Sequence, residues 1–402
     1  MSAVVRGLMV TLSLLGIAAA SAAQMLTGTI TGTVSDSTDS ILPGVTVTVT
    51  GERLIGGPQS AVTDQQGTYR IDGLPPGDYD VTFELPGFTP VDRRGVRLSA
   101  GFVATINAEL GVGTLEDRVT VTGESPVVDT RSNVQQTVMG QEILEAIPTG
   151  RDAWSLAKII PGVAVGTYDV GGTQGMQQSD ITAHGSRGDD KTFAVDGLSV
   201  NWPGNGGGGT MVYYDQGMFE ETNYQTSAIP AEVSIGGVYM NMVTKAGGNT
   251  WTGDLRYYYA DDGMQSENFQ EVSERFDFPG GNPVVTQYDF NAGAGGPLMR
   301  DRLWFFGSFR RWRVDKEVLA VRNPDGTHPL DDNLIWNGSG KLTARLTPNH
   351  RIQGVYNYNQ KDRYHRQDAD AAFIESAATT LQEQPGYAAQ LKYTAVLSGE
   401  TL

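Results

Sequence analysis

The stretch Trp251-Thr252-Gly253-Asp254-Leu255-Arg256-Tyr257-Tyr258-Tyr259 decides how the rest of the chain is interpreted. Trp251, Leu255 and Tyr257 fall on one face of an extended chain, and the opposite face carries Asp254 and Arg256. A period of two residues is the signature of a β-strand, because successive side chains of a strand point to opposite faces. The stretch therefore predicts a strand with one apolar and one mostly polar face.

Five further segments with the same alternation follow this strand. They cover residues 287–294, 303–312, 341–346, 352–358 and 387–397. The connections are short and long in turn, with tight turns expected at Gly296-Pro297 and Pro348-Asn349 and long polar loops elsewhere. With a few flanking residues each segment reaches about 9–11 residues, the length of a tilted strand that crosses a bilayer. Short turns on one side and long loops on the other are typical of outer-membrane barrels.

A soluble antiparallel sheet is the alternative, since it also alternates. An export signal helps to decide against it. Arg6 precedes an apolar run from Leu8 to Ala20 and the small residues Ser21-Ala22-Ala23, which predicts a signal peptide over residues 1–23. The run is too short for a transmembrane helix, and no later segment approaches the roughly 20 apolar residues required. Any membrane crossing is therefore expected to use strands.

Charge and cysteine content exclude several classes of protein. The net charge is −17, and loss of Arg6 with the signal leaves −18, which argues against a nucleic-acid-binding protein. The chain has no cysteine, so it can form neither disulfides nor thiolate metal sites. Its 51 glycines suit a mainly β chain with many turns.

Residues 24–112 are predicted to form a small β-sandwich. Val45, Val47 and Val49 alternate with threonines, and Tyr79 and Phe83 alternate with polar residues in a later segment. About seven short strands at this spacing are typical of a sandwich.

The sandwich contains a set of turn and core motifs. They are Gly32-Thr33-Val34, Leu42-Pro43-Gly44-Val45, Thr63-Asp64 with Gly67 and Tyr69, Leu74-Pro75 with Gly77 and Tyr79, and Gly87-Phe88. With these motifs the unit resembles the carboxypeptidase regulatory-like domain, which has a carbohydrate-binding-like fold. Sugar binding does not follow from the resemblance, because the shared residues are turn formers and core aromatics.

Residues 113–123 form a linker that includes a polar, β-branched segment. The segment consists of Glu116, Asp117, Arg118, Val119, Thr120, Val121, Thr122 and Gly123. Such a segment can add as a strand to the edge of another protein's sheet. The residues alone do not decide between this role and the alternatives, which are the last strand of the sandwich or a plain linker.

Residues 124–247 are predicted to form a small α+β domain. Helices are expected over Met139–Ile147 and Asp152–Ile160, and each is expected to end there because a proline follows. Asp152 is expected to cap the second helix. Strands are expected around Ile181 and Phe193, joined as a hairpin by the turn Arg187-Gly188-Asp189-Asp190. A last strand is expected around Met240.

Motifs in the right order connect this domain with the strands that follow. They are residues 119–130, Ile147-Pro148 with Gly150-Arg151, Ile160-Pro161-Gly162-Val163, Gly185-Ser186-Arg187, Val195-Asp196-Gly197, residues 241–245, Gly295-Gly296-Pro297 and residues 301–308. The chain thereby resembles the TonB-dependent outer-membrane receptors of the Oar-like subgroup. The resemblance implies that residues 124–247 are the plug, that 248–402 are part of the barrel, and that 116–123 are the TonB box.

The number of strands is too small for a complete receptor barrel. Only six spanning segments are present, whereas eight is the usual minimum for closure and plugged transporters have about 22. We therefore expect the chain to be the N-terminal part of a longer receptor.

No pattern for catalysis or for a cofactor is present. The four histidines lack metal or triad spacing, and the common nucleotide-binding and hydrolase motifs are missing. Asp331-Asp332, Asp368 and Asp370 could contact a cation, but solvated loop carboxylates are the simpler reading. The sequence predicts neither an enzyme nor a cofactor.

These observations predict a mainly β receptor of the cell outer membrane with its N-terminal domain in the periplasm. The resemblance implies that its partners are a periplasmic TonB-type energy-transducing protein, outer-membrane lipid and an extracellular ligand, which could be a glycan, a peptide or a ferric chelate. Ligand binding would bias the plug toward exposing residues 116–123. A surface structural or adhesion protein of the same fold is one alternative, and a secreted carbohydrate-binding module is another.

Overall fold

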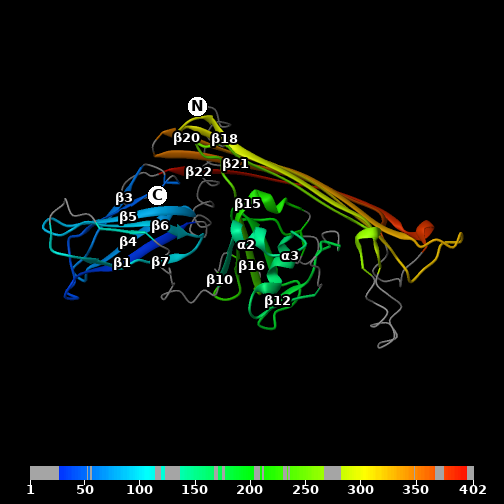
Figure 1. Cartoon of the computed structure of the whole chain (residues 1–402), viewed down its shortest axis with the longest axis horizontal. Coiled ribbons are helices and arrows are strands. Elements are labelled where there is room, and N and C mark those ends of the chain that lie inside the picture. Colours follow the sequence, from blue (N-terminus) through cyan, green and yellow to red (C-terminus); the bar gives the residue numbers. More distant parts are fainter. Residues whose placement is uncertain are drawn as a thin grey trace, which may run out of the picture.

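The computed structural model shows three parts, arranged as a sandwich, a mixed domain and one long sheet (Figure 1). It describes residues 27–51, 53–54, 57–113, 119–122, 136–166, 171–173, 177–202, 209–210, 212–229, 233, 236–266, 282–347, 349–366 and 375–395. The predicted signal peptide lies outside the described residues, as do 116–118 and 123, Asp368 and Asp370. Among the described helices, none is long and apolar enough to cross a membrane.

The sandwich predicted for the N-terminal part is confirmed. One sheet has the order β4-β1-β7, with β8 also paired to β1, and the other has the order β3-β2-β5-β6-β9. The strands are β1 (Gly28–Asp36), β2 (Thr46–Thr50), β3 (Gln59–Val62), β4 (Thr68–Leu74), β5 (Gly77–Glu84), β6 (Val91–Leu98), β7 (Val103–Thr105), β8 (Ala108–Leu110) and β9 (Val119–Thr122). Val47, Val49, Val81 and Phe83 are fully buried between the sheets, so the apolar face of each strand points inward.

The mixed domain is built on a five-stranded sheet of order β10-β15-β16-β13-β14, with a separate pair β11-β12. The strands are β10 (Gln136–Gly140), β11 (Val163–Val165), β12 (Ile181–Ala183), β13 (Lys191–Val195), β14 (Leu198–Ser199), β15 (Phe219–Gln225) and β16 (Val238–Thr244). The helices are α2 (Gln141–Ala146), α3 (Ala153–Leu156), η2 (Ala157–Ile159) and η4 (Gln216–Met218). The predicted α+β character is therefore correct.

Two local predictions in this domain were wrong. The first helix begins at Gln141, because Met139 belongs to β10, which pairs with β15, and its side chain is buried in the hydrophobic cluster of the domain. The turn at Arg187–Asp190 forms, with the Asp190 N–H donating to the Arg187 carbonyl. It does not close a hairpin, since β12 pairs with β11 while β13 pairs in parallel with β16.

The Asp152 cap is confirmed. Its carboxylate accepts hydrogen bonds from the backbone N–H groups of Trp154, at 2.9 Å, and Ser155, at 2.7 Å. An acceptor at this position satisfies N–H groups that have no partner within the first helical turn.

The last part is a single antiparallel sheet whose six strands pair in chain order. They are β17 (Thr252–Asp261), β18 (Val284–Met299), β19 (Leu303–Glu317), β20 (Leu330–Thr347), β21 (His350–Arg366) and β22 (Thr380–Ala395), with the short helices η5 (Asp262–Met264) and η6 (Ser376–Ala378) in the connections. The strands contain 10 to 18 residues, and five are longer than the sequence predicted. Pairing continues beyond the apolar segments that were used to set the expected length.

The turn predicted at Gly296-Pro297 was wrong. Strand β18 runs through both residues, and the chain reverses at residues 300–302, where the Arg302 N–H donates to the Met299 carbonyl at 3.1 Å. Pro297 is tolerated because the register shifts beside it, and proline in a sheet is found at such irregularities. Thr347 at the end of β20 pairs with His350 at the start of β21, so the chain reverses between these two residues. Pro348 of the predicted Pro348-Asn349 turn lies outside the described residues.

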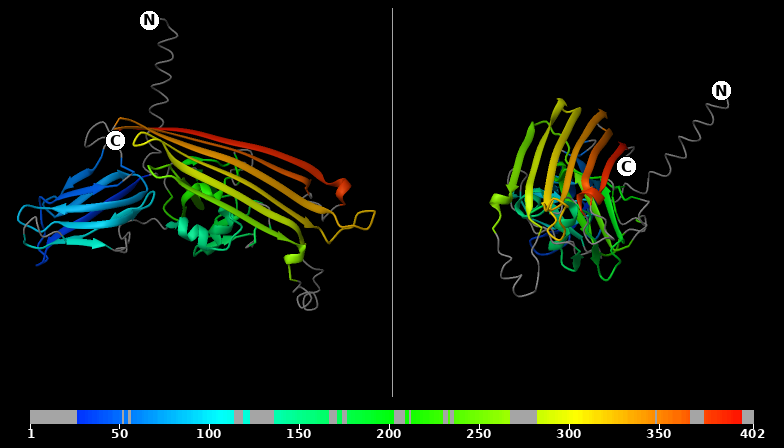
Figure 2. Two further views of the ribbon diagram at one scale, coloured as in Figure 1. Left: turned by 45° about the horizontal axis from the view of Figure 1, so that its top comes forward. Right: turned by 90° about the vertical axis from the view of Figure 1, so that its right-hand side faces the viewer.

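The long sheet arches over the mixed domain (Figure 2), and its two faces differ in polarity. Its convex face exposes apolar side chains: Trp251, Leu255, Tyr257, Tyr259, Phe309, Leu342, Leu346, Tyr356, Leu381, Tyr387, Leu391 and Tyr393. Its concave face buries polar ones: Asp289, Asn291, Ser308, Arg310, Asn333, Asn337, Ser339, Lys341, Thr343, Asn357, Asn359 and Lys361. Apolar groups outside and polar groups inside are the pattern of a membrane barrel wall, the reverse of a soluble sheet.

Candidate functional site

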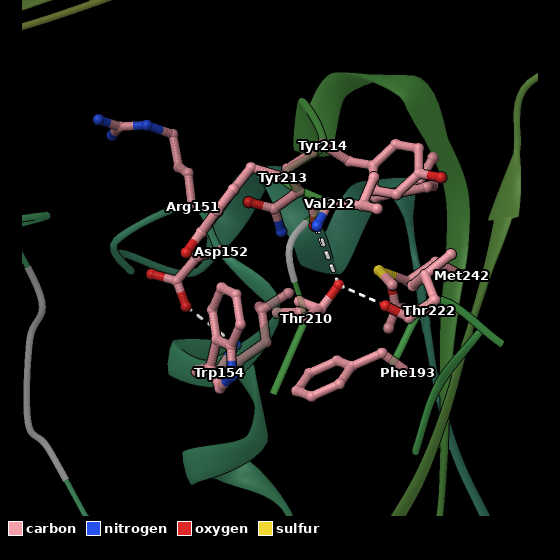
Figure 3. Close-up of a pocket in the computed structure, with 15 residues that line it drawn as sticks. Arg151, Asp152, Trp154, Phe193, Thr210, Val212, Tyr213, Tyr214, Thr222 and Met242 are labelled. Atoms are coloured by element: carbon pink, nitrogen blue, oxygen red, sulfur yellow. Dashed lines mark hydrogen bonds between the residues drawn. The ribbon is translucent and has the colours of Figure 1, made fainter. Parts of the chain in front are cut away.

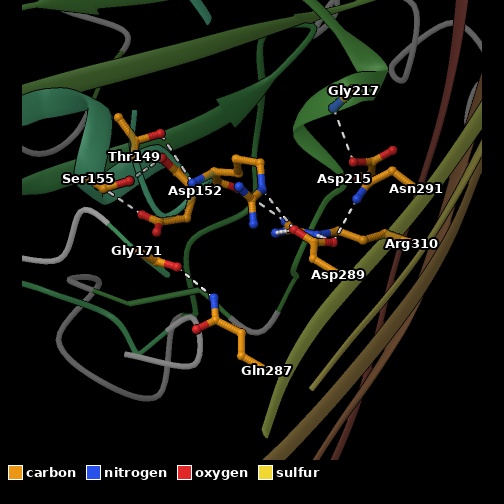
Figure 4. Close-up of polar contacts among 11 residues, drawn as sticks. Thr149, Asp152, Ser155, Gly171, Asp215, Gly217, Gln287, Asp289, Asn291 and Arg310 are labelled. Carbon is orange, nitrogen blue, oxygen red and sulfur yellow. Dashed lines mark hydrogen bonds and ion pairs between the residues drawn. The ribbon is translucent and has the colours of Figure 1, made fainter. Parts of the chain in front are cut away.

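The first contact between the mixed domain and the sheet is an ion-pair cluster around Asp289 of β18 (Figure 4). Arg310 of β19 donates two hydrogen bonds to its carboxylate, Nε–Oδ1 at 3.0 Å and Nη2–Oδ2 at 2.9 Å. Arg151, from the mixed domain, donates to Oδ2 at 2.8 Å, and its carbonyl accepts from Arg310 at 3.0 Å. Asp289 is fully buried and Arg310 nearly so, so each charge depends on its partners.

Arg151 is held in an unusual conformation for this contact. Its φ is +53°, in the left-handed region that costs non-glycine residues conformational energy. Its guanidinium also lies 3.9 Å from the ring centroid of Tyr258 on β17, close enough for a cation–π contact. The motif Gly150-Arg151 therefore supplies a side chain that binds the sheet.

The second contact joins two of the predicted motifs. Asp196 of Val195-Asp196-Gly197 accepts hydrogen bonds from the N–H and hydroxyl of Thr244, the last residue of β16. Lys341 of β20 donates to Asp196 at 3.2 Å and to the Thr244 hydroxyl at 2.7 Å. The Gly197 N–H donates to the side chain of Asn241 at 3.0 Å. The sheet thus binds the point where the two motifs meet.

The third predicted motif lies apart from these contacts. Gly185 has a φ of +78°, and the Ser186 hydroxyl accepts from the Ala183 N–H at 3.2 Å, so both residues build a turn. Arg187 is exposed, and its N–H donates to Asp190 within the same turn. Among the described residues, the motif Gly185-Ser186-Arg187 therefore serves to build a local turn.

Further polar groups of the sheet bind the main chain of the mixed domain. The amide side chain of Asn359 accepts from the Tyr213 N–H at 3.0 Å, and that of Asn337 donates to the Tyr213 carbonyl. Trp312, Val314 and Ile335 add one apolar patch to the interface, because they pack into the hydrophobic cluster of the mixed domain. The interface is otherwise mostly polar.

Asp215 lies beside the ion-pair cluster, just before η4. The residue is 2% exposed, and its carboxylate accepts from the Gly217 N–H at 3.1 Å. Burial raises the pKa of Asp215 to about 6, while the charge of Arg310 and the Gly217 hydrogen bond act in the opposite direction. The sequence did not indicate a role for three residues of this cluster, namely Asp215, Asp289 and Arg310. The position of Asp289 and Arg310 on the polar face of their strands was a signal that could have found them.

Two cavities border the interface. The larger, of about 580 Å³, lies between α2 and β17 and is lined by charged and polar side chains that include Glu145, Lys245 and Arg256. Glu145 and Arg256 form an ion pair across it at 2.7 Å. The smaller is about 40 Å³ and lies among aromatic and apolar side chains (Figure 3), so it is a packing gap. The described residues contain no cluster of three or more histidines or carboxylates that could hold a metal ion.

The sandwich docks on β15 of the mixed domain. Arg53 and Glu220 form an ion pair at 2.6 Å. The Ala100 N–H donates to the Glu221 carboxylate, and the Ala100 carbonyl accepts from the Asn223 amide, both at 3.1 Å. Burial at this contact raises the pKa of Glu221. The sandwich is therefore fastened to β15, the second strand of the five-stranded sheet.

The segment proposed as a TonB box lies at the end of the sandwich. Residues 119–122 form β9, which pairs in parallel with β6 in the register Val91↔Val119 to Arg94↔Thr122. This arrangement matches the alternative of a last strand of the sandwich, without excluding a second binding role. Glu116, Asp117, Arg118 and Gly123 lie outside the described residues.

Two family models match the chain. The carboxypeptidase regulatory-like domain matches residues 29–111, and an outer membrane beta barrel domain matches residues 243–325. The TonB-dependent transporter Oar of Myxococcus xanthus is 31% identical over 333 residues, which are 79% of this chain and 30% of that protein. The chain thus spans less than a third of the length of this relative.

Solved structures of two outer-membrane proteins are also similar. The transporter YddB of Escherichia coli is 15% identical, with a TM-score of 0.49 over 65% of this chain and 37% of that one. The ferripyoverdine receptor of Pseudomonas aeruginosa is 14% identical, with a TM-score of 0.44 over 71% and 36%. The sequence matches and the inverted polarity of the sheet faces agree. The chain is a homologue of the TonB-dependent transporter Oar and a protein of the outer membrane, and it contains a carboxypeptidase regulatory-like domain followed by β-barrel strands.

Proposed function

We propose that the chain contributes the periplasmic domain, the plug and part of the barrel wall of a receptor that imports an extracellular solute by energy-coupled displacement of the plug. The domain limits proposed are 24–112 for the sandwich, 113–123 for the linker with the TonB box, 124–247 for the plug and 248–402 for the wall. A TonB-type protein of the periplasm would bind residues 116–123. The imported solute would be a glycan, a peptide or a ferric chelate.

The observation that carries this proposal is the polar interface between plug and wall. Asp289, Lys341 and Asn359 bind the plug through hydrogen bonds, which water can replace when the plug moves. Each such bond contributes only about 0.5–1.5 kcal/mol net, or about 1.5–3 kcal/mol where a charge takes part. A dry hydrophobic interface of the same extent would resist displacement more strongly, and the apolar patch around Trp312 is small by comparison.

Uptake in cells tests the proposal. Cells that carry the receptor are offered three separate probes, namely ⁵⁵Fe-labelled ferric chelates, fluorescent dextrins and fluorescent peptides. We expect one probe to accumulate inside the cell, and uptake to stop when residues 116–123 are deleted or TonB is absent, while surface binding persists. Uptake that is independent of both would contradict import by TonB, and surface binding without any uptake would support the adhesion alternative.

A further inference from the structure

Strand β9 is paired on one side only. It ends the sheet order β3-β2-β5-β6-β9, so no described strand lies beyond it. Its Val119 N–H donates to the Pro90 carbonyl at 3.0 Å, which fixes the direction of its hydrogen bonds. Val119 is 50% exposed and Thr120 is also exposed. Within the described part of the chain, residues 119–122 thus end the sheet and leave one backbone edge unpaired.

The backbone groups of this edge alternate in direction. In a parallel pair, a residue that binds the neighbouring strand directs both its N–H and its C=O to that strand, and the next residue directs both away. Since Val119 binds β6, Val121 does so as well, and Thr120 and Thr122 direct their backbone groups to the open side. The side that faces away from the sandwich can therefore accept one more strand.

Building on the proposed function, we propose that the TonB-type protein docks on the outer edge of β9 while β9 stays paired with β6. The partner's strand then extends the sandwich sheet by one, through the backbone groups of Thr120 and Thr122. The occupant is a polypeptide with an accessible sheet edge, because main-chain hydrogen bonds are what this edge offers. The sandwich thereby becomes part of the docking surface for TonB.

Docking in place is favoured over release of β9 for two reasons. Release would break the hydrogen bonds between β9 and β6 before any new ones form, whereas addition to the open edge breaks none. The sandwich is also fastened to β15 by the Arg53–Glu220 pair and by the contacts of Ala100. A pull on β9 would consequently reach the plug through the folded sandwich.

A reversible disulfide between β9 and β6 distinguishes docking with β9 in place from docking after release of β9. The chain has no cysteine, so the double variant Val91→Cys/Val119→Cys introduces a single disulfide between register partners. Neighbouring strands lie about 4.8 Å apart, within the Cα separations that disulfides span. The detergent-solubilised receptor is titrated with the purified periplasmic domain of TonB from the same organism, before and after reduction. We expect affinities within about twofold of each other, and a tenfold loss on oxidation that reduction restores would overturn the inference.

A second variant keeps this result distinct from failure of the proposed function. Thr120→Pro removes an outward N–H and leaves the hydrogen bonds from Val119 to β6 in place, so we expect at least a tenfold loss of TonB binding. Thr120→Ala keeps the N–H and should bind as the unaltered receptor does. Unchanged binding by Thr120→Pro would contradict both the TonB box and the docking edge. If TonB binding is lost both in Thr120→Pro and in the oxidised disulfide variant, docking in place is refuted, while the TonB box itself is not.

Discussion

The sandwich and the long sheet use the same period-two alternation with opposite results. In the sandwich, Val81 and Phe83 are fully buried and the polar residues of the strand face water. In the long sheet, Leu255 and Leu391 are 72% and 77% exposed, while Asp289 and Asn357 are fully buried. The difference shows that alternation alone predicts a strand, and that the polarity of the exposed face reveals which solvent surrounds it.

Truncation of one aromatic side chain in the sandwich and one in the long sheet should produce the largest difference in stability loss between the two regions. Phe83→Ala removes a fully buried ring from the sandwich core and should destabilise it by about 3–5 kcal/mol. Tyr387→Ala, on the exposed row of β22, should cost less than about 1 kcal/mol in detergent, because the ring packs on little protein. Hydrogen exchange of residues 27–113 and of β22 measures both effects. Equal losses would contradict the difference between the regions.

A charge placed on an exposed apolar position distinguishes lipid from water. Leu391→Arg should reduce the stability of the receptor folded into lipid vesicles by about 2–4 kcal/mol if the position lies near the bilayer midplane. Val62→Arg is the matched control, because Val62 is 61% exposed on the sandwich. It should change stability by no more than about 0.5 kcal/mol. Urea titration of the vesicle-bound protein provides the comparison, and a tolerated arginine at 391 would place that face in water.

The contact between the mixed domain and the long sheet can be weakened from the side of the mixed domain. Arg151→Ala removes one hydrogen bond to Asp289 and leaves the carboxylate paired with Arg310, so we expect a loss of about 1.5–3 kcal/mol. Arg187→Ala, which removes an exposed arginine of another motif in the mixed domain, should have almost no effect. Thermal unfolding of the purified receptor checks both variants. Equal melting temperatures of the two variants would indicate that the ion-pair cluster does not hold the mixed domain against the sheet.

The smallest expected effect is a pH dependence that comes from Asp215. Its folded-state pKa of about 6 lies above the ordinary value of 3.8. The stabilisation from its protonated form is therefore complete below about pH 4 and is lost as the pH rises through 6. Asp215→Asn should raise the melting temperature by about 2–4 °C at pH 7.5 and leave it unchanged at pH 4. The exposed Asp189→Asn serves as control, and an equal shift at both pH values would contradict titration of Asp215.

The sequence predicted the regular parts of the molecule better than their pairings. Alternation along Trp251–Tyr259 was enough to assign the two faces of β17, because the alternation of side chains between faces is a local property of a strand. It could not show that Asp289 binds both Arg310 and Arg151, since these partners lie 21 and 138 residues away and meet only through strand register and plug placement.

The place of β9 was unpredictable for a related reason. Val119–Thr122 is a short polar, β-branched segment, and such a segment fits the edge of its own sandwich as well as the edge of a partner. The prediction of a hairpin at Arg187–Asp190 was wrong for the same reason. The turn depends on neighbouring residues, whereas the pairing of β13 with β16 depends on residues far away in the sequence.

The most direct test of the lipid-facing wall is a scan of β22 with spin labels. Because the chain has no cysteine, single cysteines can be placed at each position from Tyr387 to Tyr393 and labelled in lipid vesicles. The account predicts that dissolved oxygen reaches the labels at positions 387, 389, 391 and 393, which are all exposed on one face, and that a water-soluble nickel complex is excluded from them. Labels at the intervening positions should lose the oxygen signal, with a period of two residues. Access of the nickel complex to the row of Leu391, equal to that of an exposed sandwich position such as Val62, would contradict the account.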